Sequence, residues 1–539
     1  MPSPFVPVAE AIVDAMLNTS PMVALTAGDH RADDRLEDLS PDGVARQVTV
    51  LRDASDALDQ LDPDPLDEAE RVDHEILRAR VEGALFDLTE LREHEWNPLA
   101  HNPGPLIYAL IDRPVGGIEQ RLHNLAGRLA AVPDAFANAR ATLSGCPRVH
   151  VETAVGQFAG SARLVAEEVP RLLGERPSMA GEVEPAVGAA LAAFAEMDIW
   201  LRAQLASDAD RREPRLGRRM WEARLWHTLD TELTAAQVLD AAKRRLAEVT
   251  AELREAAAAY VGGPLDDDTV RRALDACTDS RPDDTSIVGF ATETLARTTA
   301  FVRENGLVSL VDDACLVREM PEYSRGVSVA YCQPPGALET AEIATLYCIA
   351  PTPAGWSPER VESFYREYND MMVHDLTVHE AMPGHYLQLA HARRYTGSTR
   401  VRALCESGPF IEGWGVYAEQ IMADAGYGGA ALRLQQLKMQ LRAILNAILD
   451  QLVHCDDLTE GEAMAMMTGQ AFQEDGEAAG KWRRALLTST QLSTYFVGYT
   501  EVSAVAAARP AGVSPGEWHD RMLSYGSPPP RHLRTLLGV

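Results

Sequence analysis

Apolar residues recur at helical intervals from about residue 5 to residue 300, and this periodicity limits the fold more than any other feature of the chain. The same stretch is rich in Ala, Leu, Arg and Glu and has few clusters of β-branched residues. Between Leu239 and Leu253, apolar residues three and four apart form one stripe, and Thr234 with Gln237 predicts the capping box that starts this helix. The pattern predicts a mainly α-helical protein.

A small β-sheet is expected within residues 306–351, where three short β-rich runs are separated by Pro and Gly. The helical pattern then resumes at Ser357, a capping residue followed by proline at the first helical position. Gly, Pro and Asp accumulate at 206–217 and 261–286, which we interpret as loops or as a subdomain boundary. We therefore divide the chain into a helical part, 1–300, and a catalytic part with the small sheet, 301–539.

Charge and cysteine usage restrict the class of partner and the compartment. The chain has 80 acidic and 50 basic residues, and its formal charge of −30 repels phosphate backbones and anionic membrane surfaces. We expect neither nucleic acid nor a membrane as partner. The first twenty residues lack a secretory signal pattern, no run approaches the length of a membrane span, and the seven cysteines form no CxxC pair. These features favour a cytoplasmic protein with free thiols.

The segment His379-Glu380-Ala381-Met382-Pro383-Gly384-His385 contains the donors of a zinc site at an unusual spacing. In the HExxH pattern, two histidines four residues apart share one helical face and the Glu serves as general base. Here the second histidine follows after six residues, which on an unbroken helix is a rotation of about 240°. Because Pro383 and Gly384 can end a helix, we expect the chain to turn between the imidazoles and bring His385 back toward His379.

The third metal ligand is expected from the run Glu412-Gly413-Trp414-Gly415-Val416-Tyr417-Ala418-Glu419. Glu412 and Glu419 are seven residues apart, so both can face one site. We assign Glu412 as the ligand and Glu419 as the residue that orients a histidine through its other ring nitrogen. The reverse assignment stays open, as does the simpler interpretation that these are two histidines at a helix end and two carboxylates on a solvated helix face.

The runs HEAMPGHYLQ (379–388) and EGWGVYAEQ (412–420) resemble the bacterial family DUF885, which is regarded as similar to helical zinc peptidases. The resemblance extends over roughly residues 300–539, and more diffusely over the first half. Tyr386 stands where the family commonly has a second histidine. The resemblance implies a helical, zincin-like body with a deep central groove, of which residues 1–300 would form one wall, and a hydrolase acting on peptides or similar amides. Further matching motifs are Pro321-Glu322-Tyr323, Ala330-Tyr331, Pro334-Pro335, Tyr495 with Gly498, His519-Asp520 and Tyr525-Gly526-Ser527-Pro528.

Other polar residues are candidates for the electrophilic side of the reaction. Tyr495 and His519 could stabilise an oxyanion, each against an equally plausible structural role. Arg531 and Arg534 could hold a substrate carboxylate, although a surface role suits them better. No Walker loop, GxGxxG fingerprint or GxSxG elbow occurs, so nucleotide-dependent and serine-hydrolase chemistry have no motif behind them.

Together these residues predict a hydrolase that holds one Zn²⁺ per chain through His379, His385 and Glu412, with Glu380 as general base, and that cleaves short peptide or amide substrates. Mn²⁺, Fe²⁺ and Co²⁺ suit the same donors. One alternative is a specialised biosynthetic enzyme that acts on a small-molecule amino-acid conjugate, even without hydrolysis. Another is a binding or scaffold protein with an inactive site. The oligomeric state is not set by the sequence.

Overall fold

The computed structural model describes residues 3–113, 115–207, 210–321, 325 and 328–539, which form two compact units. The first unit comprises Met1–Pro214, Pro335–Ile343 and Gly397–Cys405, and the second comprises Arg215–Pro334, Ala344–Thr396 and Glu406–Val539. The sequence placed the division near residue 300. The structure places it at residue 214, because the helices between 215 and 305 pack into the second unit. Whether residues 1–300 form one wall of a groove stays a prediction.

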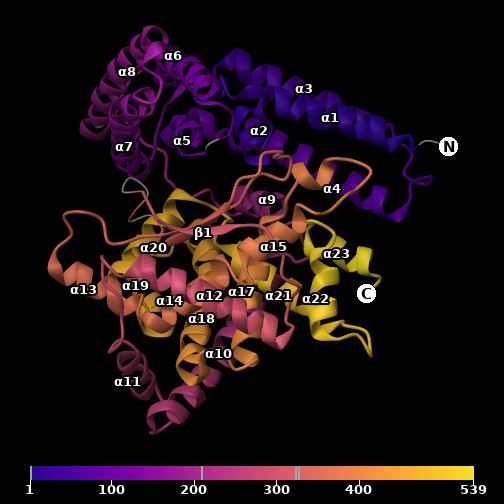
Figure 1. The fold of residues 1–539 in the computed structure, drawn as a ribbon, viewed down its shortest axis with the longest axis vertical. Coiled ribbons are helices and arrows are strands. Elements are labelled where there is room, and N and C mark those ends of the chain that lie inside the picture. The colour runs from indigo at the N-terminus through magenta and orange to yellow at the C-terminus, as the bar shows by residue number, and fades with distance from the viewer. Residues whose placement is uncertain (1–2, 114, 208–209, 322–324, 326–327) are drawn as a thin grey trace. The chain divides into compact units, whose positions relative to one another are not determined.

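The first unit is helical, and its core lies among three long neighbouring helices, α6 (Ile118–Thr142), α7 (Arg148–Leu173) and α8 (Ala180–Ala206) (Figure 1). Phe136, Phe158 and Phe194, one from each helix, meet there with ring centroids 5.0 to 6.4 Å apart. Apolar burial at helical spacing thus stabilises this unit. Its helices are α1 (Phe5–Thr19), α2 (Pro21–Ala27), α3 (Pro41–Asp59), α4 (Glu68–Phe86), α5 (Gly104–Asp112), α6 (Ile118–Thr142), α7 (Arg148–Leu173), α8 (Ala180–Ala206) and α16 (Val401–Leu404). Single 3₁₀ or π turns occur at His30–Ala32, Asp87–Leu91, Glu93–Glu95, Pro98–His101 and Pro177–Met179.

The second unit is built around α18 (Gly429–Cys455), a helix whose side chains are buried on nearly every face. Helix α10 (Ala235–Val261) lies along α18, and α17 (Gly408–Asp424) and α21 (Ser493–Ala507) pack against α18 and against each other. The expected capping box of Thr234 and Gln237 starts α10, and Ser357 caps α13 as expected. The helices of this unit are α9 (Arg218–Leu229), α10 (Ala235–Val261), α11 (Asp267–Cys277), α12 (Ile287–Asn305), α13 (Pro358–Glu367), α14 (Asp370–Glu380), α15 (His385–Ala392), α17 (Gly408–Asp424), α18 (Gly429–Cys455), α19 (Glu460–Gln470), α20 (Asp475–Leu487), α21 (Ser493–Ala507), α22 (Pro515–Leu523) and α23 (Pro530–Leu537).

A three-stranded sheet lies in the second unit, within the stretch where the sequence predicted it. Its strands are β1 (Cys315–Glu319), β2 (Ala330–Gln333) and β3 (Thr345–Ile349), in the order β1-β3-β2. β1 pairs with β3 in parallel, with Cys315 opposite Thr345, and β2 pairs with β3 antiparallel, with Ala330 opposite Ile349. Strand β2 contacts α14 and α15, so the sheet lies against the two helices that carry the histidines. The predicted mainly α-helical fold with a small sheet is confirmed.

Two further sequence expectations concern cysteines and membrane spans. All seven cysteines are free thiols, as expected. Among the described residues, no single helix combines the length and apolar character needed to cross a bilayer. The neighbours α1 and α2 reach that length and composition only together, and the chain bends by 115° between them.

Candidate metal centre

The HEAMPGH segment breaks between two helices, where the Pro-Gly pair predicted a break. α14 ends at Glu380 and α15 begins at His385. Gly384 fits this turn because a Cβ at this position would lie 1.8 Å from the carbonyl oxygen of His379, and its N–H donates to Val378 O at 2.9 Å. The carbonyl of Pro383 accepts a hydrogen bond from the Trp414 indole at 2.9 Å, which ties the turn to α17. The break thus brings the two imidazoles to the same place.

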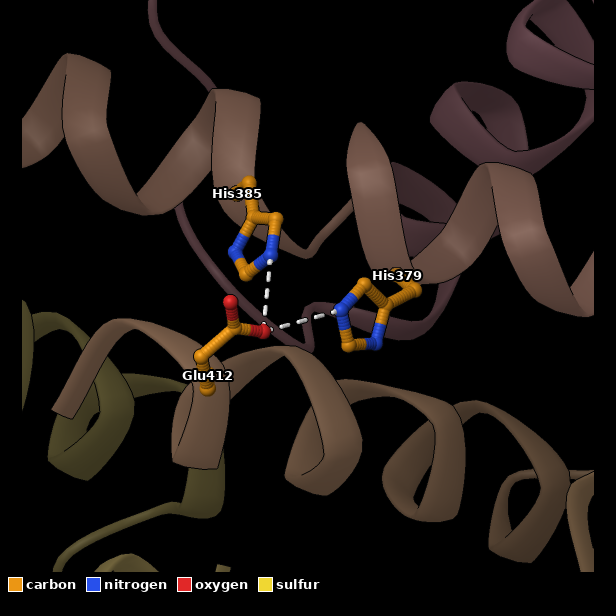
Figure 2. A group of neighbouring side chains, drawn as sticks. All are labelled: His379, His385 and Glu412. Carbon is orange, nitrogen blue, oxygen red and sulfur yellow. Dashed lines mark ion pairs between the residues drawn. The ribbon is translucent and has the colours of Figure 1, made fainter. Parts of the chain in front are cut away.

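His379, His385 and Glu412 converge on one point. Oε2 of Glu412 lies 3.5 Å from Nε2 of His379 and 3.5 Å from Nε2 of His385, and the ring centroids are 4.5 Å apart. Figure 2 shows the Glu412 side chain reaching from one helix toward both rings, which come from two other helices. Two donors bound to one zinc ion at about 2.0–2.1 Å in tetrahedral geometry are about 3.3 Å apart, so this set fits a divalent cation.

The two glycines of the EGWG run make this convergence possible. A Cβ on Gly415 would lie 2.7 Å from Cε1 of the His379 ring, so the imidazole occupies the space left by the missing side chain. A Cβ on Gly413 would lie 2.2 Å from the backbone of Gly498, so here α17 and α21 are in backbone contact. The sequence pointed to this run for its carboxylates, but the packing role of its glycines was missed.

Glu419 orients His379 from the opposite side of the ring. Its Oε1 accepts a hydrogen bond from Nδ1 of His379 at 2.6 Å, while Nε2 of the same ring lies 3.5 Å from Glu412. Only 1 % of Glu419 is exposed, and burial raises its pKa against the effect of the His379 hydrogen bond. The structure therefore places Glu412 among the three converging donors and Glu419 behind His379.

Asp375, which sequence analysis missed, lies beside this pair. It is 1 % exposed, and neither of its carboxyl oxygens has a hydrogen-bond partner among the described residues. Burial, and then the charge of Glu419, raise the pKa of Asp375 well above its usual value. The signal was available, because Asp375 precedes His379 by four residues and so shares its face of α14.

The charges at the cluster favour a bound cation. Burial alone would raise the pKa of Glu412, but hydrogen bonds from His379 and His385, and the charges of both rings, hold it well below its usual value. Burial likewise lowers the pKa of His379, yet its bonds to Glu412 and Glu419 outweigh burial and raise the pKa well above its usual value. The carboxylates around His379 thus stabilise positive charge, as a site for a divalent cation must.

Glu380, the predicted general base, is the last residue of α14 and directly follows His379. It is 9 % exposed, and no hydrogen bond or ion pair of its carboxylate occurs within the described part of the chain. Its charge contributes to raising the pKa of Tyr347 on β3, although burial is the main cause of that shift. A buried carboxylate without a partner is costly in free energy.

Tyr495 and His519 lie in different surroundings. Tyr495 lies on α21, which packs against α17, and burial raises its pKa, with the charge of Glu412 adding to this shift. His519 instead donates from Nδ1 to Leu307 O at 2.7 Å and accepts at Nε2 from the Tyr417 hydroxyl at 3.0 Å. With Tyr417 it lines a cavity of about 330 Å³, which includes none of the three converging donors.

The remaining histidines near the motif are occupied elsewhere. Nδ1 of His374 is 2.7 Å from the Tyr427 hydroxyl, and Nε2 of His391 donates to Ser309 O at 2.7 Å. Tyr386 donates its hydroxyl to Asp313 O. Within the motif at 321–323, Glu322 and Tyr323 lie outside the described residues.

The fold and the cluster together define a class: a mainly helical protein with a His-His-Glu group, its two histidines buried and its glutamate half-buried, that could hold a divalent metal. The family model described as "Bacterial protein of unknown function (DUF885)" matches residues 21–537, and the chain belongs to this family. The resemblance inferred from the HEAMPGH and EGWGVYAE runs is therefore confirmed. No curated protein matches the chain.

Two solved structures share the fold over the whole chain. A "putative lipoprotein of unknown function" from Shewanella oneidensis is 27% identical, with a TM-score of 0.81 and full coverage of both chains. A "putative lipoprotein" from Colwellia psychrerythraea is 15% identical, with a TM-score of 0.80, 99% of this chain and 98% of that chain being covered. Since both are described as lipoproteins, the cytoplasmic location expected from the sequence is wrong.

Proposed function

We propose that the protein is a metal-dependent hydrolase that cleaves peptide or peptide-like amide bonds in short substrates. One observation carries the proposal: the donor atoms of His379, His385 and Glu412 lie within 4.8 Å of one another, next to a Glu380 carboxylate with no partner among the described residues. Three nitrogen and oxygen donors beside such a carboxylate are what metal-assisted hydrolysis requires.

His379, His385 and Glu412 would hold one divalent cation per chain, and Zn²⁺ suits two imidazoles and a carboxylate best. When bound, such a cation acidifies a water molecule and polarises a carbonyl group. Glu419 fixes the ring of His379 so that Nε2 faces the cation. The three ligands come from α14, α15 and α17, which the turn at Gly384 and the contact at Gly413 hold together.

Two residues of the chain act on the substrate in this proposal. Glu380 accepts the proton of the attacking water and passes it to the nitrogen of the leaving amine. Tyr495 donates its hydroxyl to the oxyanion that forms at the carbonyl, because Arg484 donates to the phenol oxygen at 3.3 Å and so directs the phenol hydrogen elsewhere. His519 has no part, since its ring is held by Leu307 and Tyr417.

The test replaces Glu380 by Gln in the zinc-loaded protein. Elemental analysis should find unchanged metal content, and hydrolysis of a panel of short peptides and acylated amino acids, followed by mass spectrometry, should fall by at least about 100-fold. Glu460→Gln, an exposed position on α19, is the matched control and should retain full activity. Turnover by Glu380→Gln at the wild-type rate would contradict the proposal, and so would full zinc content in His385→Ala.

A further inference from the structure

Lys481 and Arg484 are two cations of α20 for which the described residues supply no acidic partner. They are three residues apart, so they share one face of the helix. Neither forms an ion pair within the part of the chain that the structure describes, although acidic residues outnumber basic ones by 80 to 50. Lys481 is only 9 % exposed. A buried ammonium without a partner is costly to fold, which suggests that a ligand supplies the missing negative charge.

The charges around Lys481 do not balance. The carboxylates whose charges raise the pKa of Lys481 are Glu477 and Glu367, and both already form ion pairs with other cations. Glu367 binds Lys438 at 2.9 Å and Arg442 at 3.4 Å, and Glu477 pairs with Arg442. Two carboxylates therefore face the four cations Lys438, Arg442, Lys481 and Arg484. Burial, and then the charge of Arg442, lower the pKa of Lys481 to about 7, as expected where positive charge is in excess.

Arg484 connects this cationic cluster to the candidate metal centre. Its Nη2 donates to Gln491 Oε1 at 2.8 Å and to the Tyr495 hydroxyl at 3.3 Å. The charge of Glu412 acts on the same tyrosine. Nη2 makes both of these bonds, so the N–H groups of Nη1 remain to donate to a carboxylate. The guanidinium thus contacts the tyrosine that is proposed to bind the oxyanion.

We propose that Arg484 and Lys481 bind the free carboxylate of the substrate, one residue beyond the scissile carbonyl. The substrates would then be short peptides or acylated amino acids that release their carboxyl-terminal residue. This inference rests on the proposed hydrolase activity for the position of the scissile bond. One residue spans roughly 3.5 Å of extended chain, which suits a carboxylate anchored beside a tyrosine that contacts the carbonyl oxygen. Arg531, suggested by the sequence for this role, is bound to Asp230 at 2.7 Å.

Calorimetry with two matched probes tests the anchor without turnover. N-acetyl-dialanine and its carboxyl-terminal amide are titrated into zinc-loaded Glu380→Gln protein. The acid should bind about 10- to 100-fold more tightly than the amide, the value of one or two hydrogen bonds between charged groups. Adding Arg484→Gln should abolish this preference and adding Lys481→Met should reduce it, whereas Arg483→Gln, at an exposed position of the same helix, should leave it unchanged.

Each result has a distinct meaning. Equal affinity for acid and amide, no binding of either probe, or a preference that survives Arg484→Gln would overturn the anchor. Thermal unfolding of each variant checks that it is folded. If Arg484→Gln does not fold, the reduced preference for the acid in Lys481→Met tests the anchor instead. A preference that depends on Arg484 in a protein whose wild type cleaves no peptide would support the anchor and reject the hydrolase. Cleavage of the acid and the amide by the wild type at equal rates would support the hydrolase and reject the anchor.

Discussion

The two carboxylates of α17 act on opposite nitrogens of the same imidazole. Oε2 of Glu412 faces Nε2 of both histidines, whereas Glu419 reaches only Nδ1 of His379. The sequence showed that the two residues share a helical face but left their roles open. A seven-residue spacing gives the face on which a side chain lies, but not which other residues it contacts. The distinction depends on the break at Gly384, which brings His385 to Glu412 alone.

Gly415 provides a test of this geometry, because it supplies none of the three donors itself. In Gly415→Ala, the added methyl group would meet the His379 ring at 2.7 Å, so the imidazole must move away from Glu412. We expect zinc affinity, measured by competition with a chromophoric chelator, to fall by about 10- to 100-fold, as when other groups that orient metal ligands are altered. The protein should remain folded.

Gly480→Ala is the matched control for Gly415→Ala. Gly480 lies inside α20, is exposed, and has open space where a Cβ would be. Alanine there should stabilise the helix by about 0.5–1 kcal/mol and leave zinc affinity unchanged. Equal zinc affinity in the two alanine variants would show that the His379 ring does not need the space at Gly415.

Whether an element could be predicted depended on whether its cause was local in the chain. Pro383 and Gly384 predicted the end of α14, and the residues Thr234 and Ser357 predicted the starts of α10 and α13, because these signals lie within a few residues of their effect. The parallel pairing of β1 with β3 could not be predicted, since it joins strands about thirty residues apart whose register no turn fixes. The same holds for the contact between α17 and α21.

The backbone contact between α17 and α21 makes Gly498 a test at the scale of elements. A Cβ on Gly498 would lie 2.0 Å from Pro409 O and would force the two helices apart. Gly498→Ala should therefore lower the free energy of unfolding by about 1–3 kcal/mol, the usual cost of overpacking, and should also weaken zinc binding because α17 carries Glu412. Denaturant unfolding and chelator competition measure the two effects. Loss of stability with unchanged zinc affinity would show that Glu412 does not depend on this contact.

At the scale of the whole molecule, two short segments from the second half of the sequence belong to the first unit. Residues 335–343 reach it through Leu338, whose N–H donates to Ala27 O at 2.7 Å, and residues 397–405 through a buried ion pair of Arg402 with Asp73 at 2.6 Å. The boundary at 214 coincides with the loop at 206–217, which the sequence marked only as one of two possible breaks. Composition cannot show which helices pack together, so residue 300 was chosen for the onset of the sheet.

His30 makes the attachment of residues 335–343 dependent on pH. Its ring is 2.9 Å from Asp33 and 2.9 Å from Glu339, and the Asp33 bond first, with the Glu339 bond, raises its pKa to about 9 against the effect of burial. A histidine whose pKa is higher in the folded than in the unfolded protein binds its proton more tightly when folded. Its contribution to stability is therefore complete below a pH of about 6.5 and is lost as the pH rises through about 9.

We expect the wild type to unfold at a higher temperature than His30→Gln at pH 6, and the difference to disappear by about pH 10. The effect should be modest, on the order of 1 kcal/mol or less, because the His30 side chain is 38 % exposed and its charge is partly screened by solvent. The control is His123→Gln, at an exposed histidine that pairs with Glu182 of α8 and does not contact Glu339. A difference between wild type and His30→Gln that stays constant from pH 6 to 10 would mean that the imidazolium does not hold Glu339.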